Sequence, residues 1–278
     1  MKTLSRTALL LLLALLLPAA TVSAKAKLTS LCEVHYPSDS NIEWTCRRLK
    51  GNDTPLGLFQ ERWQDILRFN RMDRRHFYAG ISIKVPKRLE EIRNFVPLPP
   101  SYPEAAEEPK FILVDQSEMF LGAYEYGKLV LSFPVAIGIE EHRVPNGTFR
   151  IDAADLRHES NLYTVEEIGR PYPMHYALRF FVDKSIETWP SFWIHGRDVP
   201  GYPASHGCIG LYDEEMQVDY YREHDRKVMQ PYYHELTPPF MEGAKTLYQW
   251  VVDPRTDPGT LHLIGNGPKV LVIGEPPL

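Results

Sequence analysis

The chain has 278 residues, of which 44% are apolar and 24% are charged, and its formal net charge is −5. This composition excludes a wholly disordered chain and a collagen-like repeat, and the length admits one or two domains with their own cores. The net negative charge does not support a nucleic-acid-binding function, because that function requires a strongly basic face.

The first residues have the layout of a secretory signal peptide. Lys2 and Arg6 give a basic start, an apolar run follows over 8–17, and small residues over 22–24 offer a cleavage site. As a helix the run would span about 15 Å, half of a bilayer core, so an uncleaved anchor is the weaker alternative. We expect 1–24 to be removed, the mature chain to have no stable membrane span, and the protein to reside in the periplasm or cell envelope.

Three cysteines are too few for a disulfide-dense small fold. In an oxidising compartment Cys32 and Cys46 could pair and close a short loop, worth ~3 kcal/mol in the chain-entropy model. That pairing would leave Cys208 as an odd thiol. A lipid anchor on Cys32 is disfavoured because Leu31 is bulkier than the small residue usual before a lipidated cysteine.

Residues 42–87 predict a compact unit of strand, at least one helix, and strand. The first strand is expected at 42–45, and Asp53-Thr54-Pro55 has the capping side chain and first-turn proline of a helix start. A second strand is expected over 81–85, where apolar side chains alternate. The apolar residues at helical spacing between them are Phe59, Trp63, Ile66 and Leu67.

The segment 50–86 resembles a LysM module, a small α+β family of βααβ order that binds N-acetylglucosamine-containing glycans such as peptidoglycan. Asp53-Thr54, Asn70 and the closing run Gly80–Pro86 carry the resemblance, and Asn52 interrupts the usual Gly-Asp-Thr. The resemblance implies glycan binding, and a small structural subdomain without a ligand stays the alternative.

This first unit is cationic, whereas the rest of the chain is acidic. Over 43–87 there are ten Lys and Arg against five Asp and Glu. A cationic module suits an anionic wall polymer, and a solvated helix face is the alternative. Residues 97–109, rich in proline and glutamate, are expected to form a semi-rigid linker with little to bury.

The remainder, 110–274, is expected to be mostly β, with a helix opening near 213–215 and a helical insertion at about 220–262. Gly127-Lys128 would form the turn of a hairpin. The strand patterns lie at 111–114, 119–126, 129–137, 148–151 and 270–273.

The residues around Cys208 offer the chemistry of acyl transfer through a thioester. His195 or His206 could take the proton of the thiol, because His206 would share a side with Cys208 in an extended segment and His195 could fold back across a turn. Glycines at 196, 207 and 210 permit close backbone approach, and one amide donor to an oxyanion is worth roughly 10²–10³ in rate.

Two other functions of Cys208 are open from the residues alone. His195, His206 and Cys208 could supply three zinc ligands, although their spacing fits no common zinc pattern. Cys208 could also be a small buried residue without chemistry.

His195-Gly196 followed by Ser205-His206-Gly207-Cys208-Ile209 closely resembles the catalytic signature of the L,D-transpeptidase (YkuD) family. The segments that look like the opening strands of that domain are 111–115, 126–130, 133–138 and 144–149. The resemblance covers about 110–215 and the strand at 270–273, and it implies a β-sandwich fold whose members remodel peptidoglycan.

The resemblance also implies roles. Cys208 would attack the third-residue carbonyl of a stem tetrapeptide and release D-alanine, with His195 as general base and acid. The amides around Gly207 and Cys208 would form the oxyanion hole. The residues expected to orient or line the site are Ser205, His206, Gly207, Gly196 and Arg197.

The expected partners are the stem peptides and glycan of peptidoglycan, with no metal, cofactor or nucleic acid. The acyl acceptor would be the amine of a neighbouring stem, giving a 3→3 cross-link, or a lysine of an outer-membrane lipoprotein. The alternatives are a D-amino acid or water as acceptor, the latter making a peptidoglycan hydrolase, L,D-carboxypeptidase or amidase.

One departure from the family is Gly210, where relatives commonly carry Arg or Asn. This glycine puts substrate preference in doubt and admits a catalytically decayed wall-binding protein. Arg197 could supply the missing cation, and a solvated surface arginine is the alternative.

The remaining candidates are weaker. Tyr172, Met174 and Tyr176 would line a peptide groove or pack the sheet. The histidines without ligand spacing, expected to be surface or packed residues, are His158, His175, His224, His234 and His262.

Overall fold

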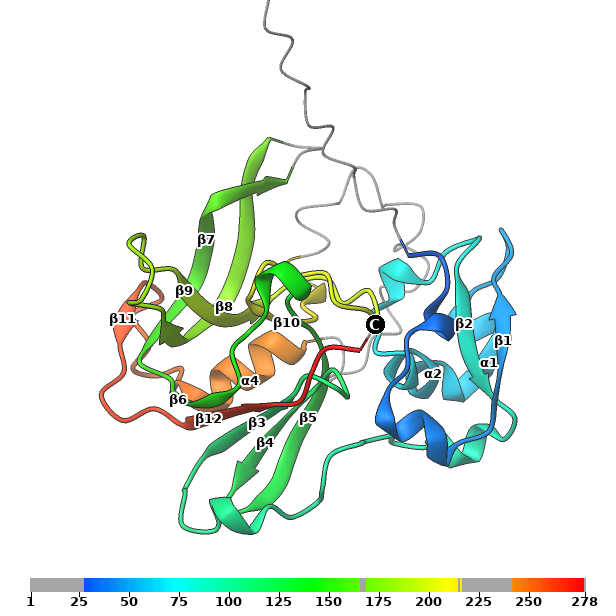
Figure 1. The fold of residues 1–278 in the computed structure, drawn as a ribbon, viewed down its shortest axis with the longest axis horizontal. Coiled ribbons are helices and arrows are strands. Elements are labelled where there is room, and N and C mark those ends of the chain that lie inside the picture. The colour runs from blue at the N-terminus through cyan, green and yellow to red at the C-terminus, as the bar shows by residue number, and fades with distance from the viewer. Residues whose placement is uncertain (1–27, 166–168, 215, 217–241, 278) are drawn as a thin grey trace, which may run out of the picture.

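The computed structural model describes residues 28–165, 169–214, 216 and 242–277. The predicted signal peptide at 1–24 lies outside these residues, as do His224, His234 and the first part of the predicted insertion. Figure 1 shows two units side by side, a small one of helices and strands and a larger one dominated by β-strands. None of the helices described is long and apolar enough to cross a bilayer.

The N-terminal unit has the predicted order of strand, two helices and strand. Its strands β1 (Trp44–Arg48) and β2 (Ser82–Pro86) pair antiparallel, and α1 (Pro55–Phe59) and α2 (Trp63–Phe69) lie between them in sequence. Short 3₁₀ turns are found at Leu31–Glu33, Pro37–Asn41, Gln60–Arg62, Arg74–His76, Leu89–Ile92, Pro103–Ala105 and Glu140–His142.

The residues that carried the LysM resemblance hold this unit together. The Thr54 hydroxyl caps α1 by accepting from the Gly57 N–H at 3.0 Å. The buried Asn70 amide donates to the carbonyls of Ile66 and Lys84 at 2.9 and 2.8 Å, and its oxygen accepts from the Lys84 N–H at 2.8 Å. Asn70 thereby joins the end of α2 to β2, because it satisfies backbone groups of both elements.

Cys32 and Cys46 form a disulfide with a Cα–Cα distance of 5.9 Å, which confirms the predicted pairing. The bond ties the chain before β1 to β1 itself. The same segment also adds to β2, since Ser30 forms a parallel bridge with Ser82. Cys208 is the free cysteine of the described chain.

The larger unit is built on one ten-stranded order, β11-β7-β8-β9-β10-β5-β4-β3-β12-β6, which confirms a mostly β fold. The strands in chain order are β3 (Phe111–Asp115), β4 (Phe120–Glu125), β5 (Lys128–Ala136), β6 (Gly147–Arg150), β7 (Ala153–Val165), β8 (Arg170–Val182), β9 (Ser191–Gly196), β10 (Ile209–Leu211), β11 (His262–Leu263) and β12 (Lys269–Ile273). The long hairpin of β7 and β8 was not predicted.

The sheet curls so that β6 lies against β8. Phe149 on β6 packs its ring 5.6 Å from that of Phe180 and 4.8 Å from that of Phe181, both on β8. Helix α4 (Gly243–Val251) packs on β8, β9 and β10 (Figure 1). Leu247 and Tyr248 are buried there, so the part of the predicted insertion over 243–251 belongs to the core.

The expectation that the linker at 97–109 buries little is wrong. Leu98 and Ala105 are buried, and the Tyr102 ring stacks on Phe111 with centroids 5.5 Å apart. The segment follows the β4–β5 hairpin, because the Tyr102 N–H donates to the Gly127 carbonyl and the Leu129 N–H to the Pro100 carbonyl. Prolines hold an extended backbone, and here that backbone finds partners on the sheet.

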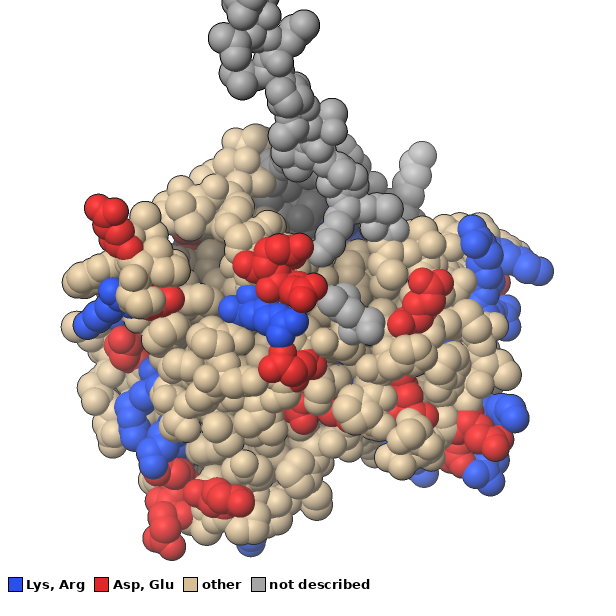
Figure 2. Space-filling model, viewed as in Figure 1, with Lys and Arg blue, Asp and Glu red and all other residues tan. Residues whose placement is uncertain are grey.

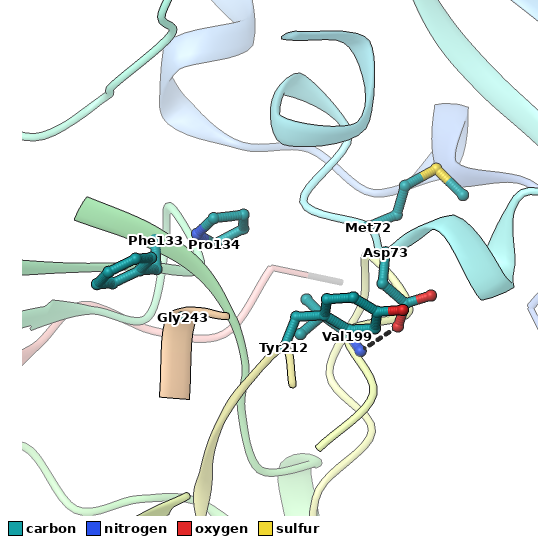
Figure 3. Close-up of a pocket in the computed structure, with 7 residues that line it drawn as sticks. All are labelled: Met72, Asp73, Phe133, Pro134, Val199, Tyr212 and Gly243. Carbon is teal, nitrogen blue, oxygen red and sulfur yellow. Dashed lines mark hydrogen bonds between the residues drawn. The ribbon is translucent and has the colours of Figure 1, made fainter. Parts of the chain in front are cut away.

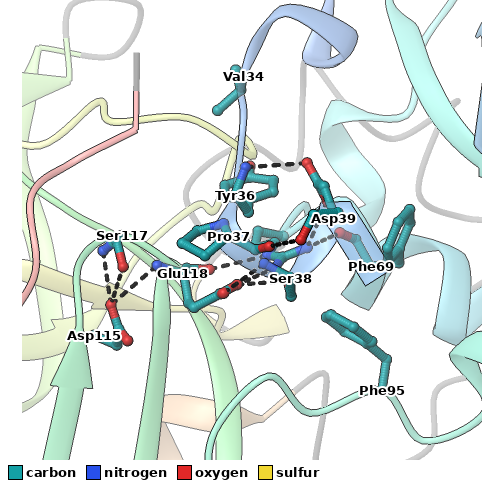
Figure 4. A network of polar contacts seen from close by, with 12 residues as sticks. Val34, Tyr36, Pro37, Ser38, Asp39, Phe69, Phe95, Asp115, Ser117 and Glu118 are labelled. Atoms are coloured by element: carbon teal, nitrogen blue, oxygen red, sulfur yellow. Dashed lines mark hydrogen bonds and ion pairs between the residues drawn. The ribbon is translucent and has the colours of Figure 1, made fainter. Parts of the chain in front are cut away.

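Part of the positive charge counted over 43–87 lies inside the molecule. Arg71 and Lys84 have no exposed surface and Arg74 is 3% exposed. Arg71 donates to Glu118 on the larger unit at 2.7 Å, and Lys84 pairs with Asp39. Figure 4 shows Glu118 reaching toward Ser38 and Asp39 between the two units.

Charges that neutralise one another inside the molecule do not act on an external polymer. The cations that stay exposed lie on the outer edge of the unit, where Figure 2 shows blue side chains. They are Arg47, Arg48, Lys50 and Lys87.

Candidate active site

The parallel pairing of β9 and β10 places Cys208 and His195 on neighbouring strands. Ile209 lies opposite Ile194 and Gly210 opposite His195. Continuing this register sets Cys208 opposite Trp193, and the sulfur is hydrogen-bonded to the Trp193 backbone. Alternate residues of a strand share a face, so Cys208, Trp193 and His195 project to the same side. Cys208 therefore lies directly before the strand that pairs with the strand of His195.

The environment keeps the thiol and the imidazole neutral. Burial raises the pKa of Cys208 to about 11, and it lowers the pKa of His195 to about 3. In the free protein both shifts favour a thiol over a resting thiolate. In a neutral pair the proton leaves the sulfur as the sulfur attacks, by general base catalysis.

The His195 ring is oriented for this task by Gly196. Its Nδ1 lies 2.8 Å from the Gly196 carbonyl, so Nδ1 carries the proton and Nε2 is the basic nitrogen. Gly196 itself has no room for a side chain, because an added Cβ would lie 3.1 Å from Asp213 and 3.2 Å from the His175 carbonyl. Gly196 thus supports His195, whereas the sequence grouped it with the substrate-binding residues.

Ser205 braces the turn before the nucleophile. Its hydroxyl donates to the Cys208 carbonyl at 2.6 Å and accepts from the Gly207 N–H at 3.1 Å. The Gly207 amide therefore already has a partner, and the oxyanion-hole proposal moves to the amide of Cys208. Ser205 is 1% exposed, which fits an orienting role rather than contact with substrate.

His206 does not lie beside Cys208 as an extended segment would place it. Gly207 has a φ of 111°, so the chain turns between the two residues. The His206 ring stacks on Tyr163 of β7 with centroids 4.5 Å apart and lies 5.2 Å from the His142 ring. His206 thus joins the β7–β8 hairpin to the catalytic turn, and His195 is the candidate base.

Arg197 occupies the space above Gly210. A Cβ added to Gly210 would lie 2.0 Å from Cγ and 1.9 Å from Cδ of Arg197, so the stem of Arg197 fills the volume that a larger residue 210 would need. Its guanidinium is 3.4 Å from Asp198 and lies over the Tyr172 ring. Its charge lowers the pKa of Cys208 against the effect of burial.

Further side chains near Trp193 and Arg197 had no site role in the sequence analysis. The His158 ring stacks on Trp193 with centroids 4.5 Å apart, and its Nδ1 lies 3.1 Å from Asp155. Asp198 accepts from the Tyr172 hydroxyl at 2.8 Å. No sequence motif marks these side chains, because their contacts join segments far apart in the chain.

The aromatic candidates divide between the site and the core. Met174 and Tyr172 belong to the small apolar cluster around Trp193 against which Cys208 packs. Tyr176 instead packs on Tyr248 of α4, 5.8 Å between centroids. Of the other histidines that were set aside, His175 is half-buried in β8 and His262 bonds the Thr260 carbonyl.

The zinc alternative finds no support in the described residues, which contain no group of three or more His, Cys, Asp or Glu side chains placed to hold a metal ion. His195, His206 and Cys208 diverge, because His206 turns away toward Tyr163.

The L,D-transpeptidase catalytic domain family, YkuD, matches residues 109–264. The match spans more than half of the chain, and the chain belongs to this family. No curated protein matches it.

Solved structures with a similar fold include L,D-transpeptidases of low sequence identity. One from Stackebrandtia nassauensis is 17% identical with a TM-score of 0.37, and 61% of this chain and 58% of that chain are covered. L,D-transpeptidase 1 from Mycobacterium tuberculosis is 15% identical with a TM-score of 0.35, over 60% and 62%. The enzyme fragment from Xylanimonas cellulosilytica is 16% identical with a TM-score of 0.41, over 82% and 97%. The chain spans about three fifths of the length of the first two.

Proposed function

We propose that the protein is an exported peptidoglycan L,D-transpeptidase with Cys208 as nucleophile and His195 as general base and acid. The observation that supports this most directly is the β9–β10 register, in which Gly210, two residues after Cys208, lies opposite His195. The neutral state of both groups and the free Nε2 of His195 support a proton transfer from sulfur to imidazole.

The proposed first half-reaction acylates the enzyme. The Cys208 sulfur attacks the carbonyl of the third stem residue while its proton passes to His195 Nε2. The oxyanion of the tetrahedral intermediate is held by the Cys208 amide. The bond to D-alanine then breaks, and His195 returns the proton to the leaving amine, which leaves a thioester on Cys208.

In the second half-reaction an acceptor amine attacks the thioester. His195 takes the amine proton, the carbon–sulfur bond breaks, and the sulfur recovers its proton. A stem amine would give a 3→3 cross-link and a lipoprotein lysine would give a protein–wall bond. Water in the same position would give a hydrolase product instead.

Intact-mass spectrometry with a disaccharide-tetrapeptide tests the proposal. We expect wild type to gain the mass of the tetrapeptide minus its terminal alanine, and Cys208→Ala to gain nothing. His195→Gln should slow adduct formation by roughly 10²-fold or more, since general base catalysis contributes that much. A wild-type protein that forms no adduct and resists iodoacetamide would instead be a decayed wall-binding protein.

The products distinguish the two enzymatic outcomes. Cross-linked dimers indicate a transpeptidase, whereas free tripeptide indicates a carboxypeptidase or hydrolase. Addition of a lipoprotein-derived lysine peptide tests the second acceptor, because a conjugate would appear at the expense of dimer.

We also propose that residues 1–24 direct export to the cell envelope and that 42–87 bind wall glycan. The exposed cations of the outer edge, Arg47, Arg48 and Lys50 among them, support attraction to an anionic polymer. Sedimentation with insoluble peptidoglycan tests binding, and we expect replacement of these three by Gln to weaken it in a salt-dependent way. Unchanged sedimentation would leave 42–87 as a structural unit.

A further inference from the structure

The segment 197–204 connects His195 to the turn that carries Cys208, and its backbone lies against the N-terminal unit. The Asp73 carboxylate accepts from the Val199 N–H at 2.6 Å, and the Asp73 N–H donates to the Val199 carbonyl at 2.7 Å. Figure 3 shows this contact in a crevice between the units that leaves no room for a water molecule. One aspartate thus satisfies both backbone groups of a buried residue of the segment.

A second contact fixes the next part of the segment. The Tyr36 hydroxyl donates to the Gly201 carbonyl at 2.5 Å. Gly201 has a φ of 87°, and an added Cβ would lie 2.7 Å from the Asn70 carbonyl. The backbone therefore approaches the N-terminal unit as closely as a glycine allows.

A chain of charges continues from Asp73 to the active site. His76 Nδ1 lies 2.9 Å from Asp73, and its Nε2 lies 3.6 Å from Asp198. Asp198 in turn pairs with Arg197, the residue whose stem covers Gly210. Asp73 and His76 belong to the N-terminal unit, whereas Arg197 and Asp198 lie two and three residues after His195.

The charges favour the ionised form of this chain. Burial opposes it, yet the carboxylates of Asp73 and Asp198 raise the pKa of His76 above its ordinary value. Likewise burial would raise the pKa of Asp198, but Arg197, His76 and the Tyr172 hydroxyl hold it well below its usual range. A protonated His76 thus joins the two units, with a charge-assisted hydrogen bond to the buried Asp73 and an ion pair with the half-buried Asp198.

From these contacts we infer that Asp73 and His76 are positioning residues of the active site, which hold the 197–204 segment and thereby set where Arg197 and the Cys208 turn meet the substrate. The inference rests on the proposed acyl transfer. The N-terminal unit would then be part of the catalytic machinery and not a tethered wall-binding module alone.

Asp73→Asn in the full chain tests the inference. The amide keeps the size of the side chain and one acceptor oxygen but loses the charge that holds His76. We expect kcat for tetrapeptide acylation to fall about tenfold or more with KM nearly unchanged, because small misplacements of reacting groups cost rate rather than ground-state binding.

Glu118→Gln is the matched control, because it is the same carboxylate-to-amide change at the same boundary. Glu118 bonds Ser38 and Arg71 and does not touch the 197–204 segment. We expect Glu118→Gln to lower the melting temperature while the folded fraction keeps the wild-type kcat. Equal effects of the two variants on kcat would reduce Asp73 to a structural role and overturn the inference.

If Asp73→Asn does not fold, His76→Gln tests the inference instead. This variant keeps the Asp73–Val199 contact and removes only the imidazolium between Asp73 and Asp198. A folded His76→Gln protein with wild-type kcat overturns the charged chain. Failure of the proposed function is seen separately, because wild type itself would then form no adduct on Cys208.

Discussion

The reactive pair at Cys208 and His195 sits in a site whose burial disfavours charge on either group. Raising the pKa of an acid stabilises its protonated form, and lowering the pKa of a base stabilises its neutral form, so both shifts favour thiol and imidazole at neutral pH. An activated cysteine with a depressed pKa would react at neutral pH without substrate. In the proposed mechanism, reactivity depends on His195 accepting the proton during attack.

This state predicts the pH dependence of alkylation. The rate of Cys208 carboxamidomethylation by iodoacetamide should rise through neutral and alkaline pH toward the pKa of about 11, because only the thiolate reacts. A small cysteine peptide, with its pKa near ~8.5, is the control and should level off earlier. A plateau for the protein at neutral pH would instead reveal a resting thiolate–imidazolium pair.

The overlap between Arg197 and the space over Gly210 predicts a strong coupling between the two positions. Gly210→Ala alone should lower the free energy of unfolding by about 1–3 kcal/mol, because the new methyl group meets Cγ and Cδ of Arg197. In an Arg197→Ala background that cost should largely vanish. Urea unfolding of the four proteins measures the cycle, and additive effects would contradict the overlap.

The same residues show what the sequence could and could not predict. The family resemblance placed Arg197 near the site, and Gly210 suggested that another cation was needed. A positive φ at Gly207 was open from the sequence, since glycine permits it. The stacking of His206 on Tyr163 was not predictable, because a contact with the β7–β8 hairpin has no local signal.

At the scale of elements, some strands around the candidate site are predictable from the sequence and others are not. The apolar strands 111–115 and 269–273 were predictable from pattern, whereas the β7–β8 hairpin was not. β8 carries Pro171 and Pro173, and the first half of β7 carries Asp155, Arg157 and Glu159, so their pairing is imposed by tertiary contacts. Sequence patterns therefore gave the buried strands of the sheet, but not the hairpin that forms one wall of the site.

The disulfide ties the segment of Tyr36 and Ser38 to β1, and its loss has a predictable cost. Cys32→Ser with Cys46→Ser should lower the free energy of unfolding by about 3 kcal/mol, because the unfolded chain regains the freedom of the closed loop. Urea unfolding of wild type with and without reductant measures the same quantity. Cys208→Ser serves as the control and should unfold like wild type under oxidising conditions.

At the scale of the whole molecule, buried charges join the two units. Arg71 donates to the Glu118 carboxylate and to the Ser38 hydroxyl, and its guanidinium lies 3.8 Å from the centroid of the Tyr36 ring. Ions withdrawn from water need complete partners, so each member depends on the others. The two units should therefore unfold together.

Removing one member of this network predicts a large loss of stability. Arg71→Met should lower the free energy of unfolding by about 3–5 kcal/mol, because Glu118 is left buried without its cation. Arg88→Met is the control, since Arg88 is exposed and pairs within its own turn with Glu91. A small change in Arg71→Met, or two separate unfolding transitions in wild type, would argue against a shared network.

The pairing of β3 with β12 bears on how a nascent chain reaches this state. β3 pairs with β4 on one side and with β12 on the other. Because β12 is translated long after β3, one edge of this apolar strand stays unpaired until the residues between them have been synthesised. Contacts between residues far apart in the sequence slow folding and prolong the exposure of unpaired, aggregation-prone strand edges. Ribosome-bound or translocating intermediates of this protein should therefore need chaperone protection until residues 269–273 arrive.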